Sequence, residues 1–311
     1  MKDTILTLTV NPAIDRIVTV DRLVFEDRAY ILSTNFAAGG RGINAARVLK
    51  SFGSTTLAIT TSGGEGGRRL EEKLKQDGFP FELVKIRNHI RTNLTISDRQ
   101  GLSVKLNEQG PSLSELELSR IRRAVEKHLP EASWLMLCGS LPPGVPSNFY
   151  AKLIRQAEKQ KVRTLLDADG DPLLHGIEAN PTVVTPNQSE AERLLNRALI
   201  TRSHSIEAVQ RIKAMGAKHA ILSLGSRGVV AASDDGVIEV VPPRIEAVCP
   251  IGAGDAMGAA FVWAMASGNT FTDSVRWGVA AGTASAQLPG IQLANFDEAK
   301  AVYPQTQVTR I

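Results

Sequence analysis

Short apolar runs that alternate with helix-length segments constrain the fold of this chain more than any other feature. After an opening run at residues 5–10, such runs recur at 134–138, 164–167, 182–185, 220–224 and 229–232. A parallel strand needs a long crossover, usually a helix, to return to its neighbour, and it is buried on both faces. The pattern therefore predicts an α/β fold around a mostly parallel central sheet.

The segments between these runs carry helical and extended patterns. Helical spacing of apolar residues predicts helices at 42–53, 68–78, 116–129, 148–161, 254–267 and 274–286. Residues 17–35 are extended and partly alternating, and residues 91–97 with 102–106 have the pattern of a hairpin. We expect these extended segments to join in a small sheet outside the main one.

Composition and charge favour a globular protein that binds small anions. The chain of 311 residues is 43% hydrophobic and 22% charged, which is close to globular averages. Its formal net charge is only +4, and its basic residues are scattered apart from clusters at 68–69 and 120–123. We expect small anionic partners rather than nucleic acid.

Targeting features point to the cytoplasm. The two cysteines, Cys138 and Cys249, lie far apart without a metal-ligand spacing. Residues 1–10 lack the apolar region and cleavage site of a signal peptide, and no stretch approaches the roughly twenty apolar residues of a membrane span. We therefore expect a cytoplasmic protein without a membrane partner.

The strongest local motif is the glycine turn at residues 250–256 (PIGAGDA), which is followed directly by an apolar helical run. Free N–H groups and the positive dipole end at a helix start favour phosphate oxygens, so Gly252, Ala253 and Gly254 are candidate phosphate-binding residues. Asp255 in the first turn is positioned to accept a proton from an attacking hydroxyl. The structural alternative is a tight turn with Asp255 as a helix cap.

Three further motifs place polar residues at the ends of expected strands, where ligands gather in open α/β sheets. Asp15, after the opening strand, can accept hydrogen bonds from sugar hydroxyls. Residues 39–44 (GGRGIN) form a second glycine turn that opens a helix, and they include Arg41 and Asn44. Residues 138–144 (CGSLPPG) follow a buried strand and include Ser140.

The second half of the chain offers groups for a nucleotide. Asn187 and Glu190 could hold a magnesium-bound water network, because Mg²⁺ prefers oxygen ligands and keeps waters. A capping box at the start of a helix is the structural alternative for the same pair, and the two roles are compatible. Residues 223–228 (SLGSRG) could approach phosphates or form a hairpin turn.

Together these segments resemble the ribokinase-like carbohydrate kinases of the phosphofructokinase B family, over essentially the whole chain. Residues 39–44 are similar to the N-terminal signature of the family and residues 250–255 to its C-terminal one; residues 9–15, 91–93, 139–144 and 223–225 match the hexose-phosphate branch. The resemblance implies a three-layer α/β/α sandwich with a small β-sheet lid. The expected organisation is one kinase domain, 1–311, with lid strands inserted at about 17–35 and 91–106.

The resemblance also implies roles for individual residues. The sugar would contact Asp15, Gly39, Gly40, Asn44 and Ser140, while its existing phosphate would pair with Arg91, assisted by Lys105. Asp255 would be the catalytic base beside Gly252, Ala253 and Gly254. The nucleotide side would comprise Arg28, Thr185, Asn187, Ser223, Gly225, Gly228, Gly252, Gly254, Ala281, Gly282 and Ser285, with Glu190 and, through water, Asn187 near Mg²⁺.

The implied activity is ATP-dependent phosphorylation of a hexose phosphate, and a phosphofructokinase giving fructose 1,6-bisphosphate is the first expectation. Tagatose-6-phosphate kinase and an inactive sugar-phosphate sensor are the alternatives. A nicotinamide-dependent oxidoreductase is disfavoured because no G-x-G-x-x-G follows the first strand. A homodimer formed through the lid is also expected.

The chain departs from the family pattern at two places. Relatives often have lysine where Thr185 stands, and that lysine can contact ATP phosphates. Cys249 and Pro250 replace the Ser/Thr-rich residues that usually precede the glycine turn. Relatives bind a monovalent cation in this region, so potassium is a candidate cofactor beside ATP and Mg²⁺. Arg41 resembles the lysine of 1-phosphofructokinases and tagatose-6-phosphate kinases.

Overall fold

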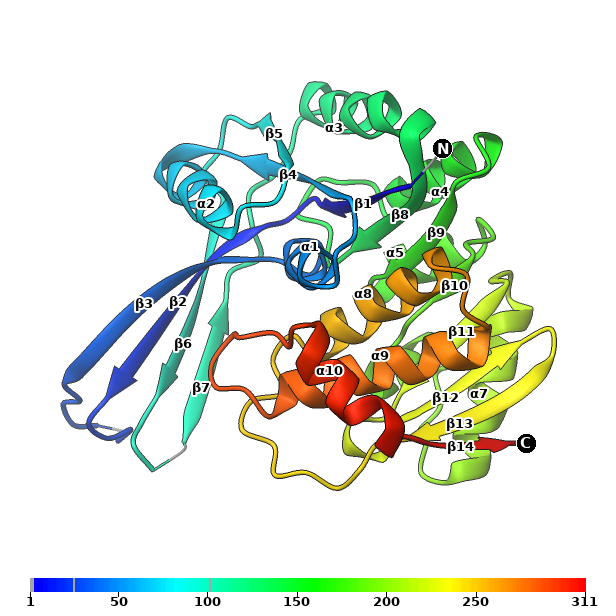
Figure 1. Ribbon diagram of the computed structural model, residues 1–311. Helices are drawn as coiled ribbons and strands as arrows, with labels where there is room; N and C mark the ends of the chain where they lie inside the picture. Colours follow the sequence, from blue (N-terminus) through cyan, green and yellow to red (C-terminus); the bar gives the residue numbers. More distant parts are fainter. Residues whose placement is uncertain (1–2, 25, 101) are drawn as a thin grey trace.

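The computed structural model describes residues 3–24, 26–100 and 102–311, so residues 25 and 101 of the expected lid ranges lie outside the described residues. The described residues form two sheets (Figure 1). The larger has the strand order β14-β13-β12-β11-β10-β9-β8-β1-β4-β5. Its strands are β1 (Thr4–Thr9), β4 (Thr56–Ser62), β5 (Phe81–Lys85), β8 (Ala132–Cys138), β9 (Arg163–Asp167), β10 (Val183–Val184), β11 (His219–Ser223), β12 (Val229–Ser233), β13 (Gly236–Val241) and β14 (Gln307–Arg310).

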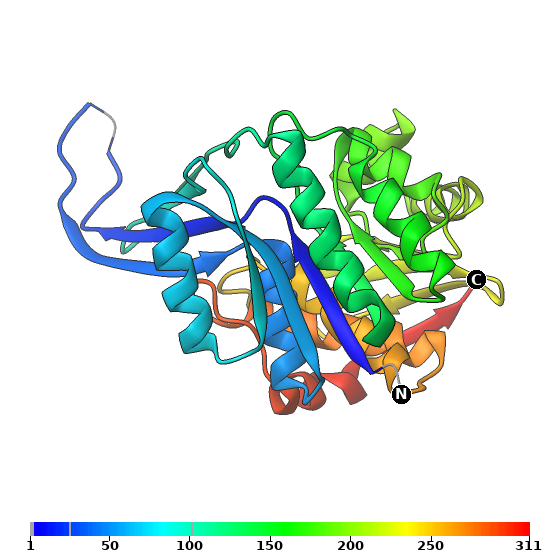
Figure 2. The ribbon, with the colours of Figure 1, turned by 90° about the horizontal axis from the view of Figure 1, so that it is seen from above.

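Helices cover both faces of this sheet. They are α1 (Arg41–Ser51), α2 (Gly64–Asp77), α3 (Glu115–His128), α4 (Phe149–Lys159), α5 (Gly170–Ile177), α6 (Gln188–Leu195), α7 (Arg202–Ala214), α8 (Ala253–Ala266), α9 (Phe271–Ala286) and α10 (Phe296–Val302). In Figure 2 the green helices and the orange and red helices lie on opposite sides of the strands. The chain thus has the expected α/β/α layers.

The core follows from strand alternation, because successive side chains of a strand point to opposite faces. Leu135 and Leu137 of β8 pack in the cluster that contains α3, α4, α5 and α7. Trp134 and Met136 of the same strand pack in the cluster that contains α8 and α9. Helix α8 is apolar all round because it lies in that second core, between the sheet and α9.

The sheet is parallel from β5 to β11, as the alternating pattern predicted, but the expectation for residues 229–232 was wrong. Strand β12 pairs antiparallel with β11, and β13 and β14 continue the antiparallel part. Only a short turn at Gly225–Arg227 separates β11 from β12, which is too short for a parallel crossover. Strands β5, β13 and β14 and helix α10 were not anticipated.

The smaller sheet projects from the body and has the strand order β3-β2-β6-β7 (Figure 1). It contains β2 (Ala13–Val20), β3 (Ile31–Gly39), β6 (Arg91–Ser97) and β7 (Ser103–Asn107). The β6–β7 hairpin is as expected, whereas β2 and β3 extend beyond the expected 17–35 range at both ends. Strands β2 and β6 pair in parallel, so two hairpins meet side by side. We call this sheet the lid.

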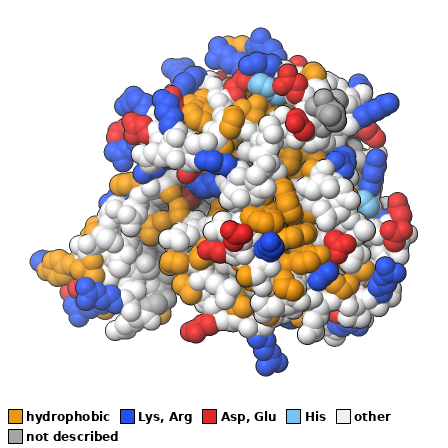
Figure 3. Space-filling model, viewed as in Figure 1, with side chains coloured by type: hydrophobic (Ala, Val, Ile, Leu, Met, Phe, Trp, Pro, Cys, Tyr) orange, Lys and Arg blue, Asp and Glu red, His pale blue; other side chains and the backbone are white. Residues whose placement is uncertain are grey.

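The two faces of the lid differ in character. Cross-strand register places Asp15, Asn93 and Asn107 on one face and Leu94 and Leu106 on the other. Exposed apolar side chains gather on the lid, and Figure 3 shows hydrophobic side chains at its projecting tip. Within the described part of the chain, no helix is long and apolar enough to cross a membrane.

Candidate active site

Polar side chains gather where the parallel strands end, at the carboxyl edge of the large sheet. Asn11 follows β1, Ser140 follows β8, and Asp167 ends β9. Asn11 donates from Nδ2 to the Ser140 Oγ at 3.2 Å, which links two of these strand ends. Crevices at this edge are where open α/β sheets bind ligands, as the sequence motifs predicted.

Helix α8 begins directly after the left-handed Gly252 (φ 80°), and Asp255 lies in its first turn. Its Oδ2 accepts a hydrogen bond of 2.7 Å from the Nδ2 of Asn44 in α1. Burial raises the pKa of Asp255 to about 7, and the nearby negative charge of Asp167 adds to the effect. A carboxyl group with such a pKa is suited to act as a base near neutral pH.

The start of α8 supplies fewer free donors than its sequence predicted. The Ala253 N–H donates to the carbonyl oxygen of Pro250 at 3.3 Å, so it is already engaged. Among the described residues, the N–H groups of Gly254 and Asp255 have no hydrogen-bond acceptor. The N–H trio of Gly252, Ala253 and Gly254 stays a prediction; in this structure the Ala253 donor serves the turn, and Gly252 and Gly254 remain candidates for binding an anion.

The other glycine turn joins lid strand β3 to α1 and places Asn44 opposite Asp255. Gly40 is the N-cap of α1 with φ 134°, a conformation that side chains rarely adopt. A Cβ at Gly39 would collide with the carboxylate of Asp15. These glycines are thus required by backbone conformation and by close packing around the predicted sugar-binding carboxylate.

Asp15 and Arg91 lie side by side at the base of the lid. Asp15 accepts a 2.9 Å hydrogen bond from Asn93 Nδ2, and burial raises its pKa, which Asn93 and Arg91 oppose. Arg91 donates to the carbonyl oxygens of Asn11 and Glu108, both at 3.0 Å, while its buried Nε has no partner among the described residues. Lys105 is exposed, and its positive charge lowers the pKa of Asp15.

Arg41, the first residue of α1, contacts carboxylates from two later elements, β9 and α6. Its Nη1 lies 2.6 Å from Asp167 Oδ1, and its Nη2 lies 3.1 Å from Glu190 Oε1. Arg41 belongs to the predicted glycine turn at residues 39–44, whereas Asp167 was not among the predicted site residues. The available signal was its position, because Asp167 ends an apolar strand run as Asn11 does.

Two of the residues predicted to lie near the nucleotide, Asn187 and Glu190, contact each other in the structure. Asn187 caps α6 and forms the anticipated capping box, in which its Oδ1 accepts from Glu190 N and Glu190 Oε2 accepts from Asn187 N, both at 2.9 Å. Burial raises the pKa of Glu190. Thr185 is buried behind this turn, and Asn187 bridges to Ser223.

Residues 223–228 form the hairpin turn that was the structural alternative. Gly225 and Gly228 have φ values of 63° and 88°, and a Cβ at Gly228 would collide with the carbonyl oxygen of Val240. The turn lies beside Asn187 through Ser223, so proximity to a nucleotide remains a prediction for these glycines.

The remaining nucleotide-side residues are spread more widely. Arg28 is exposed in the connection between β2 and β3. Gly282 allows α8 and α9 to approach, since a Cβ there would lie 2.9 Å from the Ala253 carbonyl oxygen. Ala281 and Ser285 are fully buried, and Ser285 accepts a 3.0 Å hydrogen bond from Ala294 N. That burial does not fit a nucleotide contact, and Ser285 instead holds the loop before α10.

The metal-binding expectation is compatible with the donor set. Within the described residues, no group of three or more His, Cys, Asp or Glu side chains could hold a metal ion. Mg²⁺ is usually held by one or two carboxylates together with waters and substrate phosphates. The expected pair, Glu190 and, through water, Asn187, remains a prediction. Asp167 shares the Arg41 guanidinium with Glu190 and could supply a second carboxylate.

Comparisons with known proteins identify the class to which this site belongs. The pfkB family carbohydrate kinase domain matches residues 8–298. Over 302 residues, 96% of this chain and 97% of the relative, the chain is 32% identical to ATP-dependent 6-phosphofructokinase isozyme 2 of Escherichia coli. Its identity to 1-phosphofructokinase of Borreliella burgdorferi is 32%, with 99% of each chain covered, and to tagatose-6-phosphate kinase of Staphylococcus epidermidis 28%, with 99% and 100% covered.

A solved structure extends the likeness to the fold. The potassium complex of Escherichia coli phosphofructokinase-2 superposes with a TM-score of 0.92 at 31% identity, covering 97% of this chain and 98% of that one. The fold and site thus define a sugar kinase with the ribokinase-like architecture. The chain belongs to the pfkB family of carbohydrate kinases, in the branch of hexose-phosphate kinases.

Proposed function

We propose that this protein transfers the γ-phosphoryl group of ATP to a free hydroxyl of fructose 6-phosphate and so forms fructose 1,6-bisphosphate and ADP. The observation that carries the proposal is the contact between Asp255 and Asn44, which brings the two glycine turns together. Arg91 and Lys105 lie on the Asp15 side of this contact, where a sugar phosphate would need positive charge.

In the proposed reaction Asp255 takes the proton of the attacking hydroxyl. The hydroxyl oxygen forms a bond to the γ-phosphorus while the bond to the β,γ-bridging oxygen breaks, and ADP leaves with that electron pair. Asp15 and Asn44 orient the sugar, and the Gly254 N–H stabilises charge on the transferring group. Mg²⁺ held by Glu190 and Asp167 would neutralise phosphate charge.

The chain would act as one kinase domain of residues 1–311, with the lid closing over the sugar to exclude water. Its apolar outer face, with exposed Val104 and Leu106, fits a second copy of the chain. A solved structure of the Escherichia coli relative is a tetramer, which supports self-association through some surface of this fold.

The proposal also includes the cofactors of the reaction and the location of the protein. ATP and Mg²⁺ are the proposed cofactors, and potassium is added because a relative's structure contains it. Comparing turnover in potassium and sodium salts tests the last point. Cys138 and Cys249 are free thiols, which fits the proposed reducing cytoplasm.

An ADP-forming assay with a panel of acceptors tests the function. We expect fructose 6-phosphate to give the highest kcat/KM among fructose 6-phosphate, fructose 1-phosphate, tagatose 6-phosphate and glucose 6-phosphate. Higher kcat/KM with tagatose 6-phosphate would favour the tagatose-6-phosphate kinase activity named for one relative. Binding of all acceptors without ADP formation would favour a sensor and refute the proposal.

A further inference from the structure

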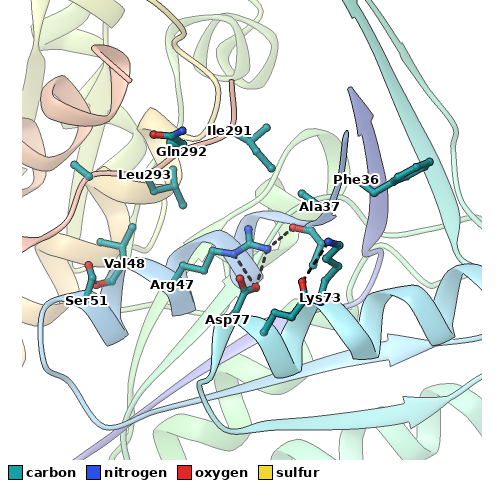
Figure 4. Close-up of a pocket in the computed structure, with 13 residues that line it drawn as sticks. Phe36, Ala37, Arg47, Val48, Ser51, Lys73, Asp77, Ile291, Gln292 and Leu293 are labelled. Atoms are coloured by element: carbon teal, nitrogen blue, oxygen red, sulfur yellow. Dashed lines mark hydrogen bonds and ion pairs between the residues drawn. The ribbon is translucent and has the colours of Figure 1, made fainter. Parts of the chain in front are cut away.

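Arg47 lies one helical turn after Asn44 in α1 and contacts three separate segments. Its Nη1 donates to Asn44 Oδ1 at 2.8 Å, and its Nη2 donates to the carbonyl oxygen of Ala38 at 2.7 Å. Its Nε donates to Asp77 Oδ2, at the end of α2, at 2.9 Å. Figure 4 shows the guanidinium reaching Asp77 and the end of β3. One side chain thus connects α1, α2 and the lid.

The contact with Asn44 determines which way the Asn44 amide points. A guanidinium can only donate hydrogen bonds, so the amide atom that faces Arg47 must be the oxygen. The amide NH₂ group then faces Asp255, to which it donates at 2.7 Å. A donated hydrogen bond stabilises the ionised carboxylate, whereas a flipped amide would present its oxygen and disfavour that form.

We infer that Arg47 is a positioning residue for phosphoryl transfer, which holds the Asn44 amide with its NH₂ group toward the base Asp255. The inference rests on the proposed function, in which Asp255 accepts the proton of the sugar hydroxyl. Arg47 acts through Asn44, because its own hydrogen bonds go to Asn44, Ala38 and Asp77.

The contact with Ala38 extends this role to the sugar side. Ala38 precedes Gly39, which packs against the carboxylate of Asp15, so Arg47 links the base of the lid to the amide that orients Asp255. The positive charge of Arg47 also lowers the pKa of Asp15. The Arg47 side chain therefore links the segment that packs against the proposed sugar-binding carboxylate, Asp15, to the amide that contacts the proposed base, Asp255.

The surroundings of Arg47 make it testable without disrupting the core. Arg47 lines a cavity of about 340 Å³ between α1, α2 and the loop at 291–294, together with Lys73 and Leu293 (Figure 4). A shorter side chain would open onto this cavity rather than leave a sealed void. The charged groups that act on Asp255 are Asp167, Arg41 and Asp15, and they would remain in an Arg47 variant.

The test compares Arg47→Met, Arg47→Lys and the control Arg276→Met. Arg276 resembles Arg47 in pairing with a carboxylate, Asp273, and with a backbone carbonyl, but it lies in α9 beside Tyr303. The readouts are kcat, KM for each substrate and the pH profile of kcat/KM, with the folded fraction measured by circular dichroism.

We expect Arg47→Met to lower kcat by about ten- to a hundredfold, because small misplacements of catalytic groups cost that much. The acid limb of its pH profile should move to higher pH by about one unit, as the amide no longer favours ionised Asp255. KM for ATP should stay within about twofold. Arg47→Lys, which keeps the charge and one donor direction, should show intermediate values, and Arg276→Met should match the wild type.

Two results would overturn the inference. One is an Arg47→Met variant whose activity falls only in proportion to its unfolded fraction, with an unmoved acid limb. The other is an equal effect in Arg276→Met. Asp255→Asn, measured in parallel, separates this failure from that of the proposed function. Near-normal turnover in Asp255→Asn refutes the proposed base itself, whereas an inactive Asp255→Asn beside a normal Arg47→Met refutes only the role of Arg47.

Discussion

The guanidinium of Arg41 lies 2.6 Å from the carboxylate of Asp167, and this contact joins the turn that opens α1 to the end of β9. The same guanidinium reaches Glu190, whose side chain is only 3% exposed. Buried carboxylates need a nearby positive charge or protonation, and here Arg41 provides the charge. Arg41 therefore compensates the negative charge of the two carboxylates that we propose to bind Mg²⁺.

Replacing Arg41 by Met should leave these two carboxylates uncompensated. We expect the free energy of unfolding without Mg²⁺ to fall by about 1–3 kcal/mol, less than for a fully buried pair because Arg41 is one-third exposed. Added Mg²⁺ should then raise the melting temperature more in the variant than in the wild type. Arg202→Met removes an ion pair with Glu239 at a position where Arg202 is exposed, and it should leave the melting temperature and its response to Mg²⁺ close to those of the wild type. Equal Mg²⁺ responses in variant and wild type would contradict the assignment of these carboxylates to the metal.

Replacing Asp255 by Asn should remove the proposed base while keeping its size and its place beside Asn44. Because general-base catalysis contributes about 10²–10⁴-fold, we expect kcat to fall by about a thousandfold. The dissociation constant for the sugar phosphate, measured by calorimetry, should change by less than about fivefold. Retention of more than about a tenth of the wild-type kcat would remove Asp255 from this role.

The activity of the wild-type enzyme should depend on the protonation of Asp255. Burial and the charge of Asp167 raise the pKa of Asp255 to about 7, and the base must be deprotonated to accept a proton. We therefore expect kcat/KM to be constant above this pKa and to fall about tenfold per pH unit below it. A profile that stays flat down to pH 5, with the protein folded, would show that no group of this kind limits the reaction.

Arg91 should matter for substrate affinity more than for chemistry. Its guanidinium is held by the carbonyl oxygens of Asn11 and Glu108 beside Asp15, and its buried Nε lacks a partner among the described residues. We expect Arg91→Met to raise KM for the sugar phosphate about ten- to a hundredfold, with kcat within about threefold. Lys105→Met, at an exposed position, should have a smaller effect. An unchanged KM in Arg91→Met would exclude Arg91 as the phosphate anchor.

The lid should mediate self-association. Val104 and Leu106 are 41% and 55% exposed on its apolar face, so Val104→Glu with Leu106→Glu should shift the protein toward monomer in sedimentation velocity experiments. Ser103→Glu adds one negative charge next to Val104 on the opposite face and should leave the oligomeric state unchanged. Identical sedimentation of all three proteins would contradict an interface at this face.

Much of the fold could be predicted because the signals are local. The apolar residues of α3 recur with helical spacing, and a glycine turn marks the start of α8. The parallel strands are visible in the sequence as short apolar runs. The antiparallel pairing of β12 with β11 was missed, although its short connecting turn was visible in the sequence. Strand β14 was missed because its partner β13 lies far earlier in the chain. Strand β13 was missed although it forms a tight local hairpin with β12.

Some features of the candidate site likewise follow from local sequence, and others depend on the tertiary structure. The sequence by itself determined the glycine turns that start α1 and α8 and the residue types, Asn44 and Asp255, that they present, because backbone conformation and helix starts are local properties. Only the tertiary structure decided that Asn44 donates to Asp255, that Arg47 orients the Asn44 amide, and that Arg41 pairs with Asp167. Asn44 and Arg41 come from α1, while their partners Asp255 and Asp167 lie more than a hundred residues later in the chain. Arg47 is held against Asn44 by Ala38 and Asp77, which belong to two other elements. Such contacts depend on how the layers pack, which no local pattern of residues encodes.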